Sequence, residues 1–211
     1  MGMNGGITAM WLLAMGGILY LTGWQRQVAD DVPGWKIVVV LAGIVLLHHY
    51  RIPIGWRGIV VYGSAAWAMV CALVALAASR SVTQSLFASL CALLSGTVWL
   101  WVRYMYESDP VFVFLRPELD GPVLAGFLAG MLTETIGMHL FVVTAAAAIA
   151  PMAAFYLPAA AARIEIGSLV WWDGMAVSLV GARLTWNVKD GLRAIAKWLG
   201  EGRSGERGGS V

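Results

Sequence analysis

Long apolar runs without charge constrain this sequence most, and residues 58–78 form one of them. These 21 consecutive residues include no Asp, Glu, Lys or Arg. A helix of about 20 apolar residues is long enough to cross the hydrocarbon core of a bilayer. The run therefore predicts a membrane-spanning helix.

The composition supports the same environment for the whole chain. Hydrophobic residues make up 60% of it and charged residues 12%, against roughly 45–50% and about 25% in ordinary soluble domains. Such a chain has too few polar side chains to cover a water-facing surface, which excludes a soluble enzyme, a disordered chain and a disulfide scaffold. Its net charge of +2 is too balanced for a nucleic-acid-binding protein, so we expect no nucleic-acid partner.

Six apolar segments predict an all-α, polytopic membrane bundle of about six transmembrane helices. Their ranges are 7–24, 35–50, 58–78, 82–102, 121–157 and 166–186. No Lys or Arg precedes the first segment, so we interpret it as a retained span rather than a cleaved signal. Because residues 121–133 alone are too short to cross, we expect one fifth helix from Gly121, bent near Pro151, where proline removes a backbone donor.

The C-terminal segment changes character after residue 186. Apolar and basic residues recur there at helical spacing on different sides: Val188, Leu192, Ile195 and Leu199 on one, and Lys189, Arg193 and Lys197 on the other. This pattern predicts a cytoplasmic amphipathic helix over residues 187–199, lying on an anionic leaflet. Residues 200–211 are rich in Gly, Ser, Arg and Glu and are predicted to be a disordered tail.

Lys and Arg favour the cytoplasmic side of a membrane protein and thereby indicate orientation. With six spans and both termini inside, ten of the 14 basic residues lie on the cytoplasmic side and four outside. With seven spans and an external N-terminus, the division is nine and five. The six-span arrangement has the larger excess of basic residues on the cytoplasmic side. Both arrangements place the basic C-terminus in the cytoplasm.

Three polar residues inside apolar segments are candidates for function, because ionisable groups at membrane depth are costly and often mark ion pathways. Glu134 lies between apolar runs, and His139 and Asp173 are the candidate helpers. A transporter would use Glu134 as the carrier of a proton or cation. The alternative is a structural hydrogen bond, or a loop position for Glu134 if a new helix begins at Ile136; Asp173, next to two tryptophans, fits a head-group position.

Gly126 and Gly130 form a GxxxG motif, which lets two membrane helices approach closely. Cys71 and Cys91 lie inside apolar runs and are interpreted as small apolar residues. Neither a nucleotide-binding nor a zinc-protease motif occurs. We therefore predict no catalytic residue, no metal site and no cofactor.

The layout resembles the small, uncharacterised YphA-type membrane proteins of Gram-positive spore formers. The shared features are a length near two hundred residues, a first span that runs into Leu21-Thr22-Gly23-Trp24, and a long acidic connection, 107–120, before a Gly-rich helix. The resemblance implies a bacterial plasma membrane and no established activity.

Three functional hypotheses follow. The leading one is a multi-pass plasma-membrane protein that acts without enzymatic activity, as a scaffold or accessory subunit, through helix packing with a membrane protein or with a second copy. The alternative is a small proton- or cation-coupled transporter that uses Glu134. A third, a lipid-modifying enzyme, requires a cluster drawn from His48, Arg51, Arg103 and Arg183 at one head-group level.

Overall fold

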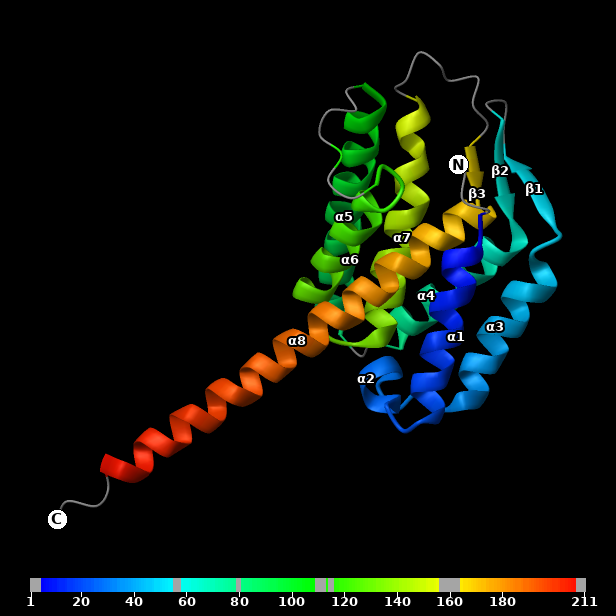
Figure 1. Cartoon of the computed structure of the whole chain (residues 1–211). Coiled ribbons are helices and arrows are strands. Elements are labelled where there is room, and N and C mark those ends of the chain that lie inside the picture. Colours follow the sequence, from blue (N-terminus) through cyan, green and yellow to red (C-terminus); the bar gives the residue numbers. More distant parts are fainter. Residues whose placement is uncertain are drawn as a thin grey trace.

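The structure is a computed structural model, and it describes residues 5–54, 58–78, 81–108, 113, 116–155 and 164–207. It is mostly helical, with a small sheet at one end (Figure 1). In chain order the elements are α1 (Ile7–Leu21), α2 (Gln25–Ala29), α3 (Gly34–Leu47), β1 (Arg51–Ile54), β2 (Ile59–Tyr62), α4 (Gly63–Ala77), α5 (Val82–Ser108), α6 (Asp120–Leu132), α7 (Ile136–Ile149), the 3₁₀ helix η2 (Ala150–Phe155), β3 (Ile164–Ile166) and α8 (Leu169–Arg207).

Consecutive apolar helices run in opposite directions, because the end of each lies next to the start of the following one. Tyr20, at the end of α1, donates a hydrogen bond to the Val32 carbonyl just before α3, and the Gly63 amide that begins α4 donates to the Tyr50 carbonyl just after α3. Short connections join α4 to α5 and α6 to α7. In the described part of the chain this alternation runs through α1, α3, α4, α5, α6, α7 and α8.

The packed centre lies between α5, α6, α7 and α8 and is built largely from alanines. Ala88, Ala125, Ala129, Ala146 and Ala182 each have 0% of their surface exposed, so the helices approach closely with little side chain between them. Many larger apolar side chains point outward, such as Leu86 and Leu90 of α5, at 62% and 64% exposed. An apolar exterior around a small-residue interior suits a bundle surrounded by lipid.

The fold is mostly helical, as expected, but it also contains a small three-stranded sheet that the sequence did not predict. β2 lies in the middle, antiparallel to β1 and parallel to β3. The segment expected to be helical over residues 58–78 therefore begins as a strand, and α4 starts only at Gly63. Ile59, Val60, Val61 and Tyr62 are β-branched or aromatic residues, which favour an extended backbone when a pairing strand is present.

The expected single helix over residues 121–157 is wrong, because the structure has two helices and a 3₁₀ turn there. α6 ends at Leu132 and α7 begins at Ile136, with Thr133 and Thr135 in extended conformation. The Thr135 hydroxyl accepts a hydrogen bond from the Met138 amide, which is an N-terminal helix cap. α7 ends at Ile149, two residues before Pro151, as expected from the missing proline donor.

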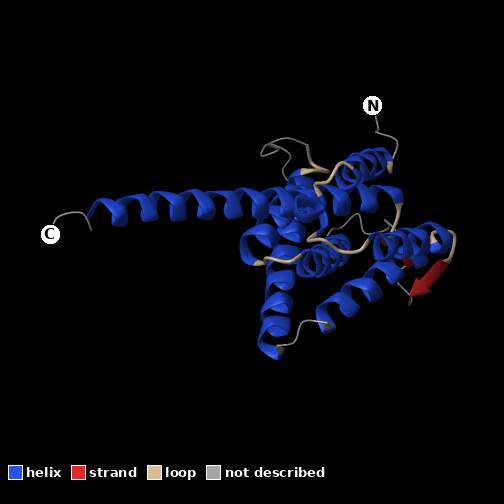
Figure 2. Ribbon diagram, turned by 90° about the horizontal axis from the view of Figure 1, so that it is seen from below, coloured by secondary structure: helices blue, strands red, loops and turns tan. Residues whose placement is uncertain are grey.

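The separate amphipathic helix expected over residues 187–199 is also corrected. α8 continues without a break from Leu169 to Arg207, and its C-terminal half extends away from the other elements (Figures 1 and 2). Residues 200–207, expected to be disordered, are helical, while 208–211 lie outside the described residues. No proline interrupts this segment, so the backbone hydrogen-bond pattern continues past the last bundle contact.

Helix length and composition do not confirm the expected six spans. In the described residues, two helices, Val82–Tyr106 and Ile136–Ala154, are long and apolar enough to cross a bilayer by length and composition. Four further apolar helices are shorter: Ile7–Leu21, Gly34–Leu47, Gly63–Ala77 and Asp120–Leu132.

Candidate functional site

Polar contacts gather at the two ends of the bundle, which we call the sheet end and the Arg183 end. The sheet end contains β1 to β3, the start of α1 and the start of α8. The Arg183 end contains α2, the end of α6, the start of α7 and residues 183–193 of α8. The polar candidates Glu134, His139 and Asp173 lie at or near these ends.

At the sheet end, Asp173 of α8 caps the start of α1. Its two carboxylate oxygens accept hydrogen bonds from the Gly6 and Ala9 amides, each at 2.7 Å. The first amides of a helix have no partner within it, and Gly6, the N-cap of α1, has no side chain to supply one. Asp173 is 9% exposed, and both oxygens are engaged in holding α1 against α8.

A second polar group at the sheet end surrounds the buried Ser64. Trp172 donates to its hydroxyl oxygen at 3.3 Å, and His48 Nδ1 lies 3.2 Å from the same oxygen. Because the indole N–H is only a donor, the serine oxygen is the acceptor in its contact with Trp172. This group joins the end of α3 to the starts of α4 and α8.

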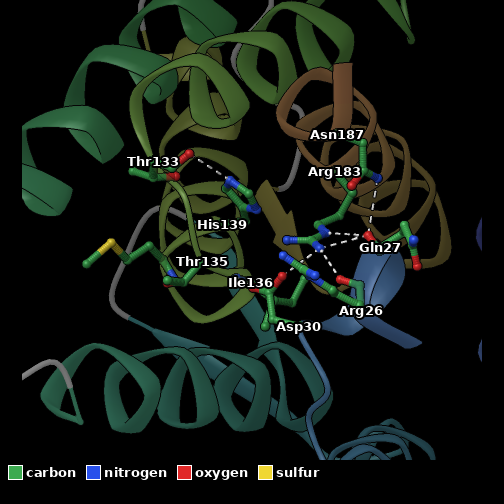
Figure 3. Close-up of polar contacts among 10 residues, drawn as sticks. Arg26, Gln27, Asp30, Thr133, Thr135, Ile136, His139, Arg183 and Asn187 are labelled. Carbon is green, nitrogen blue, oxygen red and sulfur yellow. Dashed lines mark hydrogen bonds and ion pairs between the residues drawn. The ribbon is translucent and has the colours of Figure 1, made fainter. Parts of the chain in front are cut away.

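At the opposite end, Arg183 of α8 is the centre of a network that joins three segments (Figure 3). Its guanidinium donates to the Arg26 and Gln27 carbonyls, from 2.7 to 3.1 Å, and pairs with Asp30 Oδ1 at 2.7 Å. The side chains of Arg183 and Asp30 are 8% and 26% exposed. The arginine thus satisfies carbonyls of the short helix α2 and pairs with the acid that follows it.

Asp30 uses its other oxygen on α7, because Oδ2 accepts a hydrogen bond from the Ile136 amide. A carboxylate at a helix N-terminus also interacts favourably with the helix dipole. Asp30 has a φ of 49°, a left-handed conformation that Asp adopts more readily than most residues. The backbone turn after α2 therefore aims one carboxylate at both α7 and α8.

His139 is fully buried in the first turn of α7 and lies beside this network (Figure 3). Its Nε2 is 3.1 Å from the Thr133 carbonyl, which can only accept, so Nε2 carries the proton and Nδ1 is the acceptor in the neutral ring. His139 thereby ties α7 to the end of α6. Its Nδ1 and the Nη1 of Arg183 have no hydrogen-bond partner among the described residues.

Glu134 does not lie within a helix but in the short connection between α6 and α7. It pairs with Arg193 of α8 at 3.0 Å, and the two side chains are 62% and 60% exposed. The hydrogen bond from Arg193 lowers the pKa of the Glu134 carboxyl, and the nearby charges of Arg193 and Lys189 add to that shift. Glu134 and His139 thus occupy different elements, with different exposure.

Gly126 and Gly130 lie directly against α8. A Cβ built on Gly126 would lie 2.3 Å from the Ser178 carbonyl oxygen, and one built on Gly130 would lie 2.3 Å from that of Ala182. Lys189 of α8 donates to the Gly130 and Met131 carbonyls, which are among the last of α6. The end of α6 is therefore held by close backbone contact and by a cation at its negative pole.

The sequence predictions did not single out Asp30, and they named Arg183 only as a member of the cluster that the lipid-enzyme hypothesis requires. The signal for both was weak, since neither lies in a motif and 153 positions separate them. The cluster required by the lipid-enzyme hypothesis does not form. His48 and Arg51 lie at the sheet end, whereas Arg183 lies at the other end.

A family model matches most of this chain. The model described as YphA-like integral membrane protein matches residues 31–208, which include every element from α3 to α8. No curated protein and no solved structure matches the chain.

Proposed function

This chain belongs to the YphA-like integral membrane protein family, and from that premise we propose that it is a non-enzymatic scaffold or accessory subunit that acts through helix packing in the membrane. The role of its polar residues carries the proposal. Asp173, Asp30, Arg183 and Lys189 are all engaged in helix-terminal contacts inside the chain. Their charges stabilise a bundle and leave an apolar exterior for neighbours.

We further propose seven spans, with the N-terminus outside and the C-terminus in the cytoplasm. Seven alternating helices place the start of α1 and the C-terminal half of α8 at opposite ends, and Asp173 joins the starts of α1 and α8. Nine basic residues then fall on the Arg183 side: Arg26, Lys36, Arg80, Arg183, Lys189, Arg193, Lys197, Arg203 and Arg207. Five fall on the other side, so the Arg183 end is assigned to the cytoplasm.

The short helices are compatible with this topology. α1, with 15 residues, is about 22 Å long at 1.5 Å per residue, less than the ~30 Å hydrocarbon core. Bilayers adapt to short spans by thinning, and flanking residues extend toward the head groups. Reporter fusions after residue 54 and at the C-terminus test the assignment, because seven spans require an external and a cytoplasmic reporter, respectively.

The transporter hypothesis has less support from the positions of its candidate residues. Glu134, its carrier, is largely exposed in a connection and paired with Arg193, and both Asp173 oxygens are occupied by α1 amides. In proteoliposomes with an internal pH or cation indicator, we expect the wild-type protein to give no flux above empty vesicles. Flux that Glu134→Gln abolishes in a folded protein would establish the transporter instead.

Photo-crosslinking tests the scaffold proposal directly. A photoreactive residue in place of Leu90, which is 64% exposed on α5, should give a discrete protein adduct in native membranes. The same residue in place of Ala92, which is 3% exposed on the same helix, is the matched control and should give none. Lipid adducts alone, from Leu90 and from other exposed positions on α1 and α3, would refute a role through helix packing.

A further inference from the structure

The C-terminal half of α8 carries an apolar stripe that no other described element covers. Val188, Leu192, Ile195 and Leu199 are 61%, 62%, 57% and 57% exposed. Their 4-3-4 spacing places them within an arc of about 60° on an α-helix of 3.6 residues per turn. The stripe lies on the part of α8 that extends away from the bundle (Figures 1 and 2).

The structure gives two of the three basic residues of this segment a different task from the one that the sequence suggested. Lys189 donates to the end of α6, and Arg193 pairs with Glu134. Both contacts are made to the bundle, and both residues lie about 90° or more around the helix from the centre of the stripe. These two cations hold α8 to α6 and to the connection before α7, whereas the stripe itself is apolar.

We propose that residues 184–199 of α8 dock into the apolar boundary of the cytoplasmic leaflet, with the stripe in contact with lipid chains; this rests on the membrane topology proposed above. Continuity identifies lipid as the occupant. Leu184, 61% exposed on the part of α8 that contacts the bundle, lies on the same side of the helix as the stripe. The lipid-facing side of α8 therefore continues into the stripe without a turn of polar residues.

Trp198 supports the same placement. It is 73% exposed and lies beside the stripe, about 60° beyond Ile195 around the helix. Tryptophan is enriched at the membrane interface, where its ring is apolar and its N–H can contact head groups. Burial of apolar surface, rather than attraction to anionic lipid, is then the main contribution to docking, because Lys189 and Arg193 are already engaged with the bundle.

The test uses the full chain in nanodiscs, with Cys71 and Cys91 replaced by Ala. An environment-sensitive fluorophore is attached through Ile195→Cys on the stripe, or through Ala194→Cys, about 100° away on the same turn, as the matched control. We expect doxyl-labelled lipid to quench the probe at position 195 several-fold more than the probe at 194, and iodide to show the reverse preference. The same result is expected in phosphatidylcholine alone and with added phosphatidylglycerol.

Three results would overturn the proposal. Equal iodide quenching at both positions would mean that the stripe lies in water. Protection at 195 only with phosphatidylglycerol would mean that anionic attraction drives docking. Protection from both quenchers, with energy transfer between labelled copies, would identify a second copy as the occupant. A probe at Leu90→Cys on α5 separates the two proposals: if it too is quenched by iodide, the membrane topology has failed as well.

Discussion

Arg183 and Asp30 form an ion pair at 2.7 Å, although 153 positions separate them in the chain. The pair joins α8 to the turn after α2, and Asp30 extends the contact to the first amide of α7. Removing one partner of a buried ion pair is costly, because the other charge remains without compensation. The Arg183 end of the bundle therefore depends on both residues.

Asp30→Ala is expected to lower the stability of the protein strongly. It leaves the 8%-exposed guanidinium of Arg183 without its carboxylate, a loss for which about 3–5 kcal/mol is typical in buried pairs. Asp30→Asn, which can still accept from the Ile136 amide, should cost less. The unfolding temperatures of both variants can be measured in detergent by size-exclusion chromatography after heating. An Asp30→Ala variant as stable as the wild type would contradict the role of the pair.

Asp173→Ala should loosen the start of α1 selectively. The Gly6 and Ala9 amides lose their acceptors, and loss of a helix N-cap costs about 0.5–2 kcal/mol. Hydrogen exchange followed by mass spectrometry should show faster exchange in residues 6–10, with little change in α5. Uniform protection of residues 6–10 in the variant would mean that Asp173 is not the effective cap.

Gly126→Ala and Gly130→Ala should separate α6 from α8. Each new Cβ would lie 2.3 Å from a backbone oxygen of α8, and overpacking of this kind costs about 1–3 kcal/mol. Gly16→Ala in α1 is the matched control, since nothing lies within 4 Å of a Cβ built on Gly16, and it should be neutral or slightly stabilising. Melting temperatures of the three variants in one detergent compare them; a control as unstable as the others would point to a general effect of the substitution.

The Glu134–Arg193 pair should contribute little at neutral pH and less in acid. Both side chains are mainly exposed, and such pairs contribute under about 1 kcal/mol. Arg193 lowers the pKa of Glu134 below its usual 4.5, so its stabilisation is present above that pH and is lost as the pH falls through the lowered value. The difference in unfolding temperature between wild type and Glu134→Gln, measured from pH 7 to pH 3, should therefore shrink only below pH 4.5.

Part of the candidate site could be predicted from local patterns in the sequence. The GxxxG motif marked Gly126 and Gly130, and the structure places both against α8. The alternative that a new helix begins at Ile136 describes Glu134 better than a deep position in a continuous helix. The partner of Asp173 was not predictable, because the Gly6 and Ala9 amides have no side-chain signature in a sequence.

The sequence by itself determined the solvent and most of the helices. Uncharged apolar runs require a bilayer, and the helical periodicity after residue 186 depends only on residues that are near neighbours in the chain. Tertiary structure decided the break between α6 and α7, the small sheet and the pairing of Asp30 with Arg183. Each of these features depends on groups from distant segments that pair as charges or form backbone hydrogen bonds with one another. These groups meet only when the chain has folded.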